Sequence, residues 1–267
     1  EARMADGQPG SSDTDTIAQI RESVAALCAR FPGAYWRKLD RDRAYPTEFV
    51  QAMTEGGFLG VLIPEEYGGS GLSLTVAANI LETVHASGGN AAALHAQMYI
   101  MGTLLRHGSE AQKAHWLPRI ASGETRLQAF GVTEPDAGTE TTAIGTTARR
   151  EGDGYVISGQ KIWTSRAEHS DLMILLARTT PRTEVAKRSD GLSVFLVDMK
   201  AALGRGMTIT PIRTMLNHAT TAVYFDNLRI PEGNLIGEEG RGFRYILDGM
   251  NAERILIAAE CIGDADW

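Results

Sequence analysis

The segment FGVTEPDAGTETT, Phe130–Thr142, lies where the hydrophobic period of the chain changes, and this change decides the fold. Over residues 13–123, apolar residues recur at steps of three and four, which predicts helices. Over residues 127–237, apolar and polar residues alternate, which predicts strands. A surface turn needs only the proline and the glycine of the segment. The additional hydroxyl groups of Thr133 and Thr139 therefore indicate that this loop has a further purpose.

The predicted fold class is α+β, with more than one domain. Residues 1–12 are polar and rich in glycine and serine, so we expect a flexible arm. Residues 13–126 should form an N-terminal all-α domain, a bundle of about five or six helices. Residues 127–238 should form a middle antiparallel β-barrel or sandwich, because strands follow one another without intervening helices. Residues 239–267 should form the first helix of a C-terminal helical bundle.

The last segment is expected to be one long amphipathic helix. Its apolar residues recur at helical spacing, and they are Phe243, Ile246, Leu247, Met250, Ile255, Ile257 and Ala258. No later segment of the sequence could cover this apolar face. We therefore expect either that the protein continues past Trp267 or that the helix docks on another chain.

The composition is typical of a soluble globular protein. Of the 267 residues, 43% are hydrophobic and 22% are charged, and the net charge of −7 disfavours a nucleic-acid partner. Apolar runs are too short to span a membrane and no signal peptide opens the chain, so we expect a cytoplasmic location, or the mitochondrial matrix in a eukaryote. Cys28 and Cys261 are expected to be reduced thiols in the core. The six histidines are scattered, so no metal site is predicted.

Four blocks of the sequence, in order, resemble signatures of the acyl-CoA dehydrogenases. GFLGVLIPEEYGGSGLS (Gly57–Ser73) is similar to the N-terminal signature of that family, and GVTEPDAGTETT (Gly131–Thr142) resembles its first flavin-binding signature. GYVISGQKIWTS (Gly154–Ser165) resembles the second, and IPEGNLIGEEGRGF (Ile230–Phe243) leads into a helix like the one that opens the family's C-terminal domain. The resemblance covers nearly the whole chain. It implies bound FAD and the loss of most of the C-terminal helical domain.

The first flavin signature assigns expected roles to five residues. Thr133 would bond the pyrimidine edge of the flavin, and Val132 would give a backbone contact. Gly138 and Thr139 would lie near the pyrophosphate, because a glycine lets the backbone approach closely. Phe130 stands where the family often has tyrosine or another aromatic residue.

The second flavin signature assigns expected roles to two more residues. Trp163 would cover one side of the flavin ring, and the hydroxyl of Ser165 would lie near flavin N5, where the family usually has threonine. Taken singly, each residue also suits a purely structural role, namely a helix-capping threonine and a core tryptophan.

The resemblance also implies a catalytic base. Many members of the family carry this glutamate in a loop of the C-terminal domain, but members similar to the isovaleryl-CoA and long-chain types carry it immediately before an arginine. Here that position is Glu253, followed by Arg254, although a solvated helix carboxylate would explain Glu253 equally simply. Arg254 and Asn251 would lie beside the substrate thioester. Thr139 and Ser189 are candidate contacts to the CoA portion.

The implied reaction is α,β-dehydrogenation of an acyl-CoA thioester to the trans-2-enoyl-CoA, with the α-proton removed by glutamate and the β-hydride passed to flavin N5. The implied acceptor is an electron-transferring flavoprotein, and the implied assembly is a homo-oligomer, a dimer or tetramer. An acyl-CoA oxidase or a related flavin monooxygenase is one alternative. A non-catalytic homologue that binds acyl-CoA is another, and a colourless purified protein would favour it.

Overall fold

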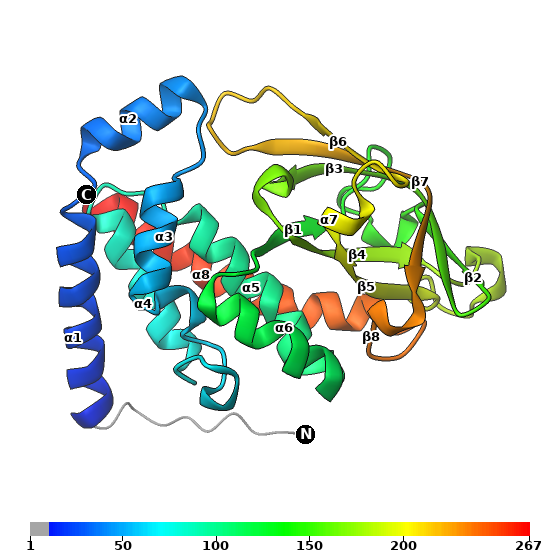
Figure 1. Cartoon of the computed structure of the whole chain (residues 1–267), viewed down its shortest axis with the longest axis horizontal. Helices are drawn as coiled ribbons and strands as arrows, with labels where there is room; N and C mark the ends of the chain where they lie inside the picture. The colour runs from blue at the N-terminus through cyan, green and yellow to red at the C-terminus, as the bar shows by residue number, and fades with distance from the viewer. Residues whose placement is uncertain (1–10) are drawn as a thin grey trace.

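The computed structural model describes residues 11–267, and Figure 1 shows a helical half beside a β half. The flexible arm expected over residues 1–12 lies outside the described residues except for its last two positions. These two begin helix α1 (Ser11–Cys28), so the helical region starts slightly earlier than the sequence predicted. The α+β fold class is confirmed.

Within residues 11–267, six α-helices precede the sheet, in agreement with the predicted five or six. They are α1 (Ser11–Cys28), α2 (Gly33–Asp42), α3 (Thr47–Glu55), α4 (Leu74–Ala86), α5 (Ala92–His107) and α6 (Glu110–Ser122). Side chains at the helix starts explain two of these boundaries. The hydroxyl of Ser73 accepts the Val76 N–H at the start of α4, and Ser109 forms a capping box with Gln112 at the start of α6.

The sheet has eight strands in the order β6-β7-β3-β2-β4-β5-β8, with β1 also paired to β4. The strands are β1 (Leu127–Gly131), β2 (Thr147–Glu151), β3 (Gly154–Ser165), β4 (Leu172–Arg178), β5 (Leu192–Asp198), β6 (Met207–Pro211), β7 (Thr220–Pro231) and β8 (Leu235–Ile236). Strands β1 and β2 both run parallel to β4, so the sheet is mixed rather than purely antiparallel. Gly131 at the end of β1 lies beside Leu175, and Thr147 at the start of β2 lies beside Arg178, so after the long loop β2 continues along β4 in the same direction as β1.

A hairpin turns at Gly152-Asp153, where the sequence Gly152-Asp153-Gly154 favours a short turn. Strands β2 and β3 are antiparallel, with Glu151 opposite Gly154, and the two residues between them make the turn. Gly152 has a φ of 62°, a conformation that favours glycine in such short turns.

Helix α8 (Gly242–Asp266) leaves the sheet and returns across the helical half, where it packs against α4 and α5 (Figure 1). A partner for this helix was not expected within the chain, so that part of the prediction was wrong. The contact is close: a Cβ on Gly263 would lie 2.3 Å from the carbonyl oxygen of Glu82 on α4. The opposite side of α8 exposes Leu247, Ile255 and Ile262.

The two cysteines differ in environment. Cys28 is buried in the core of the helical half, as predicted, whereas Cys261 is exposed on α8, so the prediction of a second core thiol was wrong. Within residues 11–267, no helix is both long and apolar enough to cross a membrane.

Candidate active site

A cavity of about 250 Å³ lies between α5, the sheet and α8. Residues singled out in both flavin signatures line it, together with the glutamate singled out on α8. They are Phe130, Thr133, Trp163, Ser165 and Glu253. Three separate regions of the sequence therefore meet at one cavity.

A β-bulge in β3 turns Trp163 toward this cavity. Lys161 and Thr164 pair with Val223 and Thr221 of β7, so two residues of β3 oppose one residue of β7. Trp163 takes a φ of 61°, which is unusual for a bulky residue and is typical of positions that the surrounding structure constrains. Its side chain is 57% exposed. The tryptophan is therefore not a core residue but offers a flat apolar surface to a ligand.

A buried ion pair holds the loop that carries Thr133. Lys161 on β3 has no exposed surface, and its Nζ donates to Glu134 Oε1 at 2.7 Å and to the Val132 carbonyl at 3.0 Å. The Glu134 carboxylate also accepts the backbone N–H groups of Gly145 and Thr146 at 2.6 and 2.9 Å. The pair thus ties both ends of the loop between β1 and β2 to the sheet.

The protonation of this pair follows from its burial. Desolvation lowers the pKa of Lys161 to about 8, and the nearby carboxylate limits the decrease. Burial alone would raise the pKa of Glu134, but the Lys161 ammonium and the backbone donors outweigh it and hold that pKa below its usual value. Both groups are therefore charged at neutral pH.

Glu253 enters the cavity from α8, whose Ile257 and Glu260 line it as well. The spacing of four and seven residues places these three side chains on one face of the helix. Glu253 is partly buried, and within residues 11–267 its carboxylate has no ion-pair or hydrogen-bond partner. A carboxylate in this setting is free to act on a bound molecule.

Several cavity residues were not anticipated from the sequence. They are His95 and Tyr99 on α5, Gln128 on β1, Arg166 after β3, His218 before β7 and Glu260 on α8. Burial raises the pKa of Tyr99 well above its usual value, so its phenol stays protonated. Glu260 could have been found from its seven-residue spacing to Glu253. The others come from elements that no spacing connects to Glu253, although Arg166 directly follows Ser165 and His95 and Tyr99 lie four residues apart on α5.

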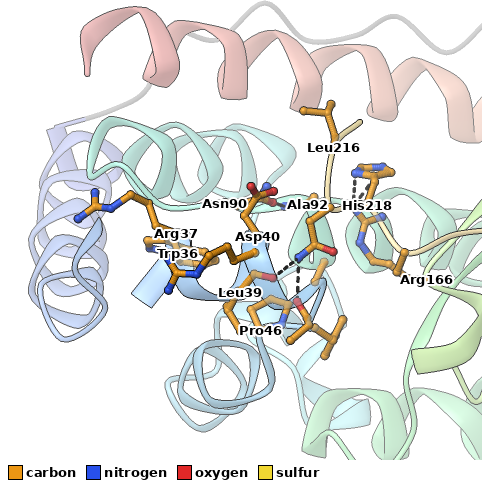
Figure 2. A pocket seen from close by; sticks show the side chains of 16 residues that line it. Trp36, Arg37, Leu39, Asp40, Pro46, Asn90, Ala92, Arg166, Leu216 and His218 are labelled. Carbon is orange, nitrogen blue, oxygen red and sulfur yellow. Dashed lines mark hydrogen bonds between the residues drawn. The ribbon is translucent and has the colours of Figure 1, made fainter. Parts of the chain in front are cut away.

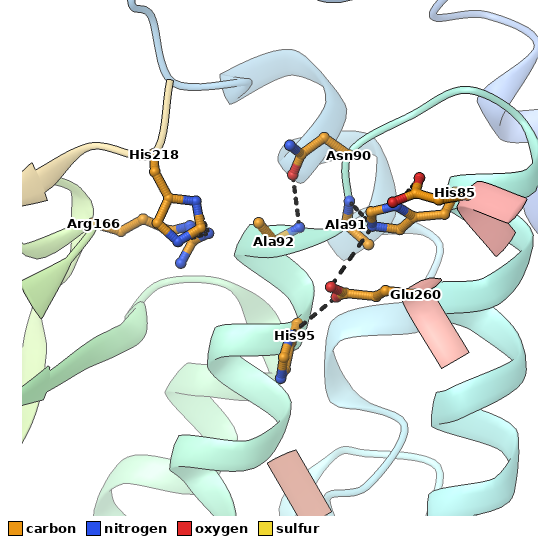
Figure 3. A network of polar contacts seen from close by, with 9 residues as sticks. His85, Asn90, Ala91, Ala92, His95, Arg166, His218 and Glu260 are labelled. Carbon is orange, nitrogen blue, oxygen red and sulfur yellow. Dashed lines mark hydrogen bonds and ion pairs between the residues drawn. The ribbon is translucent and has the colours of Figure 1, made fainter. Parts of the chain in front are cut away.

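A network of polar contacts joins α4, α5 and α8 behind the cavity (Figure 3). His95 Nδ1 lies 3.1 Å from Glu260 Oε1. His85 accepts the Ala91 N–H at Nε2, so its Nδ1–H donates to Asp264 Oδ1 at 2.8 Å. The network fixes α8, and therefore Glu253, relative to α5.

The remaining predicted site residues lie outside the cavity. Val132 is buried and its carbonyl accepts from Lys161, while Gly138 and Thr139 are exposed on the loop that follows. A Cβ on Gly138 would meet nothing within 4 Å, so no close approach inside this chain requires a glycine there.

The predicted substrate contacts also lie apart from the cavity. Ser189 is partly buried in the loop before β5. Arg254 and Asn251 are exposed on α8 and bond to each other, with 3.0 Å between Arg254 Nη1 and Asn251 Oδ1. The structure therefore does not bring these residues together with Glu253 in one cavity.

Figure 2 shows a second cavity, of about 550 Å³, which shares part of its wall with the first. It lies among α2, the start of α5 and the loop between β6 and β7, and its wall includes Trp36, Asp40 and Asn217. The two cavities share Ala92, Arg166 and His218. The larger cavity contains none of the predicted site residues, so we take the smaller one as the candidate active site.

Two family models match the chain. The model described as "Acyl-CoA dehydrogenase, N-terminal domain" matches residues 14–124, and "Acyl-CoA dehydrogenase, middle domain" matches residues 129–228. The chain belongs to the acyl-CoA dehydrogenase family. Members of this family are FAD-dependent oxidoreductases.

Individual acyl-CoA dehydrogenases agree with this assignment. The chain is 34% identical over 212 residues to acyl-CoA dehydrogenase FadE26 of Mycobacterium tuberculosis, covering 79% of this chain and 52% of the relative. It is 35% identical to glutaryl-CoA dehydrogenase of Desulfococcus multivorans, covering 84% and 58%. A solved glutaryl-CoA dehydrogenase complex with glutaryl-CoA superimposes with a TM-score of 0.84 at 29% identity, covering 97% of this chain and 64% of that one. The chain thus spans roughly half to two thirds of the length of these relatives.

The residues of the smaller cavity fit a flavin ring. The exposed indole of Trp163 offers a flat face, and Thr133 and Ser165 offer hydroxyl groups for polar ring edges. Gln128 contributes a buried amide nitrogen, Nε2, that has no hydrogen-bond partner within residues 11–267. An unpaired buried donor is costly unless a ligand satisfies it. The donor set therefore suits the carbonyl and nitrogen edges of FAD.

Proposed function

We propose that this acyl-CoA dehydrogenase family chain carries the flavin site and the base of an enzyme that converts an acyl-CoA thioester to the trans-2-enoyl-CoA. In this proposal residues 13–126 form the N-terminal domain, residues 127–238 the flavin- and CoA-binding domain, and residues 239–267 the start of a C-terminal helical domain. One observation carries the proposal. Glu253 lines the same cavity as Thr133, Trp163 and Ser165, although α8 and the flavin signatures are far apart in sequence.

The bound FAD would accept the β-hydrogen as hydride. Glu253 would remove the α-proton, since its carboxylate has no partner within the described residues and faces the cavity. Trp163 and Thr133 would orient the ring, and Ser165 would bond near N5. Ile257 and Ala96 would keep water from the reacting carbons. Other residues would act from outside the cavity wall. The flavin or its pyrophosphate would be contacted by Val132, Gly138 and Thr139. The CoA thioester would be contacted by Ser189, Asn251 and Arg254.

The test is an anaerobic titration of the FAD-loaded protein with a panel of acyl-CoA thioesters, followed by flavin absorbance. Wild type should bleach with at least one thioester, and Glu253→Gln should bind the same thioester without bleaching. The matched control is Glu22→Gln, a change of the same kind on the exposed face of α1, which should bleach like wild type. Equal bleaching by wild type and Glu253→Gln would exclude Glu253 as the base.

An acyl-CoA oxidase remains the second candidate, because the same residues suit both reactions. Reoxidation kinetics separate the two. A dehydrogenase should pass its electrons to an electron-transferring flavoprotein and react slowly with O2, whereas an oxidase should be reoxidised by O2 within the catalytic cycle. We also propose a homo-oligomer, a dimer or tetramer, and light scattering of the purified protein would test it.

A further inference from the structure

Arg166 is a buried cation without an anionic partner. Arg166 is only 7% exposed. Within residues 11–267, no carboxylate oxygen lies within 4.0 Å of its guanidinium nitrogens. The contacts that the structure gives its side chain are to the ring nitrogens of His218, at 3.4 Å. Burying a charge is costly unless the charge is paired and hydrogen-bonded. The buried guanidinium of Arg166 therefore lacks an anionic partner among the described residues, and a bound ligand could supply one.

The backbone around Arg166 is held firmly in place. Arg166 has a φ of 57°, in the left-handed region, and its N–H donates to the Ala219 carbonyl at 2.8 Å. Ala219 has a φ of 47°, so both partners of this contact take conformations that are rare outside glycine. Such conformations persist where the surrounding structure fixes them, often at ligand sites.

The neighbours of Arg166 do not neutralise it. Burial and the nearby guanidinium lower the pKa of His218 to about 4, so this imidazole is uncharged at neutral pH. Glu260 is the carboxylate across the cavity. Its Oε1 lies 3.1 Å from His95 Nδ1 without a hydrogen bond, and its charge favours the charge of Arg166 from a distance, but it makes no ion pair with the guanidinium (Figure 3). His95 itself lines the cavity and has a buried Nε2 without a hydrogen-bond partner among the described residues. The wall thus presents a cation without an ion-pair partner among the described residues. It also presents three buried polar atoms without hydrogen bonds within residues 11–267, namely His95 Nε2, Gln128 Nε2 and Glu260 Oε1.

The position of Arg166 relative to Glu253 indicates which part of a ligand it would meet. Glu253 lines only the smaller cavity, whereas Arg166 lines both the smaller cavity and the larger one beyond it (Figure 2). Arg166 therefore lies at the end of the smaller cavity that adjoins the larger one. A chain whose reacting carbons sit at Glu253 and which extends along the cavity would bring its far end to the guanidinium.

We propose that Arg166 binds a carboxylate at the far end of the acyl chain, so that the substrates are ω-carboxyacyl-CoA thioesters. The inference rests on the proposed acyl-CoA function and extends it to a substrate class. A guanidinium matches a carboxylate because it can donate two parallel hydrogen bonds to the two oxygens. His95 Nε2 supplies a further polar atom on the wall of the smaller cavity. A methyl-terminated chain would leave the buried charge unpaired.

The experiment measures binding to the FAD-loaded protein by calorimetry, without turnover. The probes are ω-carboxyacyl-CoA thioesters from succinyl-CoA to suberoyl-CoA, each beside the methyl-terminated thioester with the same number of carbons. Wild type should bind the best ω-carboxy thioester at least about tenfold more tightly than its methyl-terminated counterpart, as expected for a hydrogen-bonded charged pair. Arg166→Gln should abolish this preference and leave methyl-terminated binding nearly unchanged or tighter. Arg166→Lys should keep part of it.

The control is Arg149→Gln, which removes an exposed arginine on β2 and should leave the preference intact. Equal affinities for both members of every pair in wild type would overturn the inference while leaving the acyl-CoA function in place. Binding of no thioester would overturn both. A preference that survives Arg166→Gln, or an Arg166→Gln effect seen only in the flavin reduction potential, would assign the guanidinium to another role and overturn the inference.

Discussion

Replacing Lys161 with methionine tests whether the buried ion pair holds the flavin loop. Methionine keeps most of the side-chain volume but removes the ammonium that bonds Glu134 and the Val132 carbonyl. The Glu134 carboxylate would then be buried without a cation, and it can avoid this only by taking up a proton. With an ordinary pKa of 4.5, protonation at pH 7 costs about 3.4 kcal/mol. The unpaired Val132 carbonyl adds about 1 kcal/mol.

We therefore expect Lys161→Met to lower the free energy of unfolding by about 4–5 kcal/mol at pH 7, in the range measured for broken buried pairs. At pH 5 the same protonation costs only about 0.7 kcal/mol, so the loss should shrink to about 1–2 kcal/mol. The direction of this pH dependence follows from the linkage between protonation and folding. In wild type the depressed pKa of Glu134 contributes stability above pH 4.5 that is lost in acid, and the variant lacks this contribution.

The assay is urea unfolding, followed by circular dichroism, at both pH values. The control is Lys200→Met, which removes an ammonium that is 74% exposed and 2.6 Å from Asp171, and which should change stability little. A loss below about 1 kcal/mol for Lys161→Met at pH 7, or an equal loss at both pH values, would refute the reasoning.

Three further changes probe other parts of the structure. Gly263→Ala should destabilise the protein by about 1–3 kcal/mol in urea, because the new Cβ would meet the Glu82 carbonyl on α4; an unchanged midpoint would argue against the α4–α8 contact. A thiol reagent should label Cys261 quickly and Cys28 only on unfolding, since burial raises the pKa of Cys28 to about 11. Rapid labelling of two thiols per native chain would contradict the burial of Cys28. Trp163→Ala should lower the FAD content of the purified protein but leave the melting temperature of the apoprotein nearly unchanged, because the side chain is 57% exposed; equal FAD content would remove Trp163 from the flavin site.

The elements of the fold that depend on local sequence could be predicted. The six helices, the caps at Ser73 and Ser109, and the hairpin after β2 each follow from periodicity or turn chemistry over a few residues. The parallel pairing of β1 with β4 could not, because the choice of a strand partner depends on packing between distant segments. The docking of α8 on α4 was missed for the same reason.

Part of the candidate site could likewise be predicted from the sequence, and part could not. Motif resemblance pointed to Thr133, Trp163 and Glu253, and the structure brings these residues to one cavity. Nothing in the local sequence indicates that Arg166 and His218 meet, because 52 positions separate them. The contact forms only where the loop before β7 passes the end of β3. Asn251 and Arg254 lie within two positions of Glu253 in sequence, yet the turn of the helix directs them to the exposed side of α8.

The return of α8 to the helices at the start of the chain has a consequence for synthesis on the ribosome. About 150 residues separate His107, the last residue of α5, from Leu256, which is buried against the helical core. At about 5–20 residues per second, that interval lasts roughly 7–30 s. During this interval α4 and α5 are synthesised before the helix that covers their apolar faces, so those faces are exposed to aggregation until translation reaches α8.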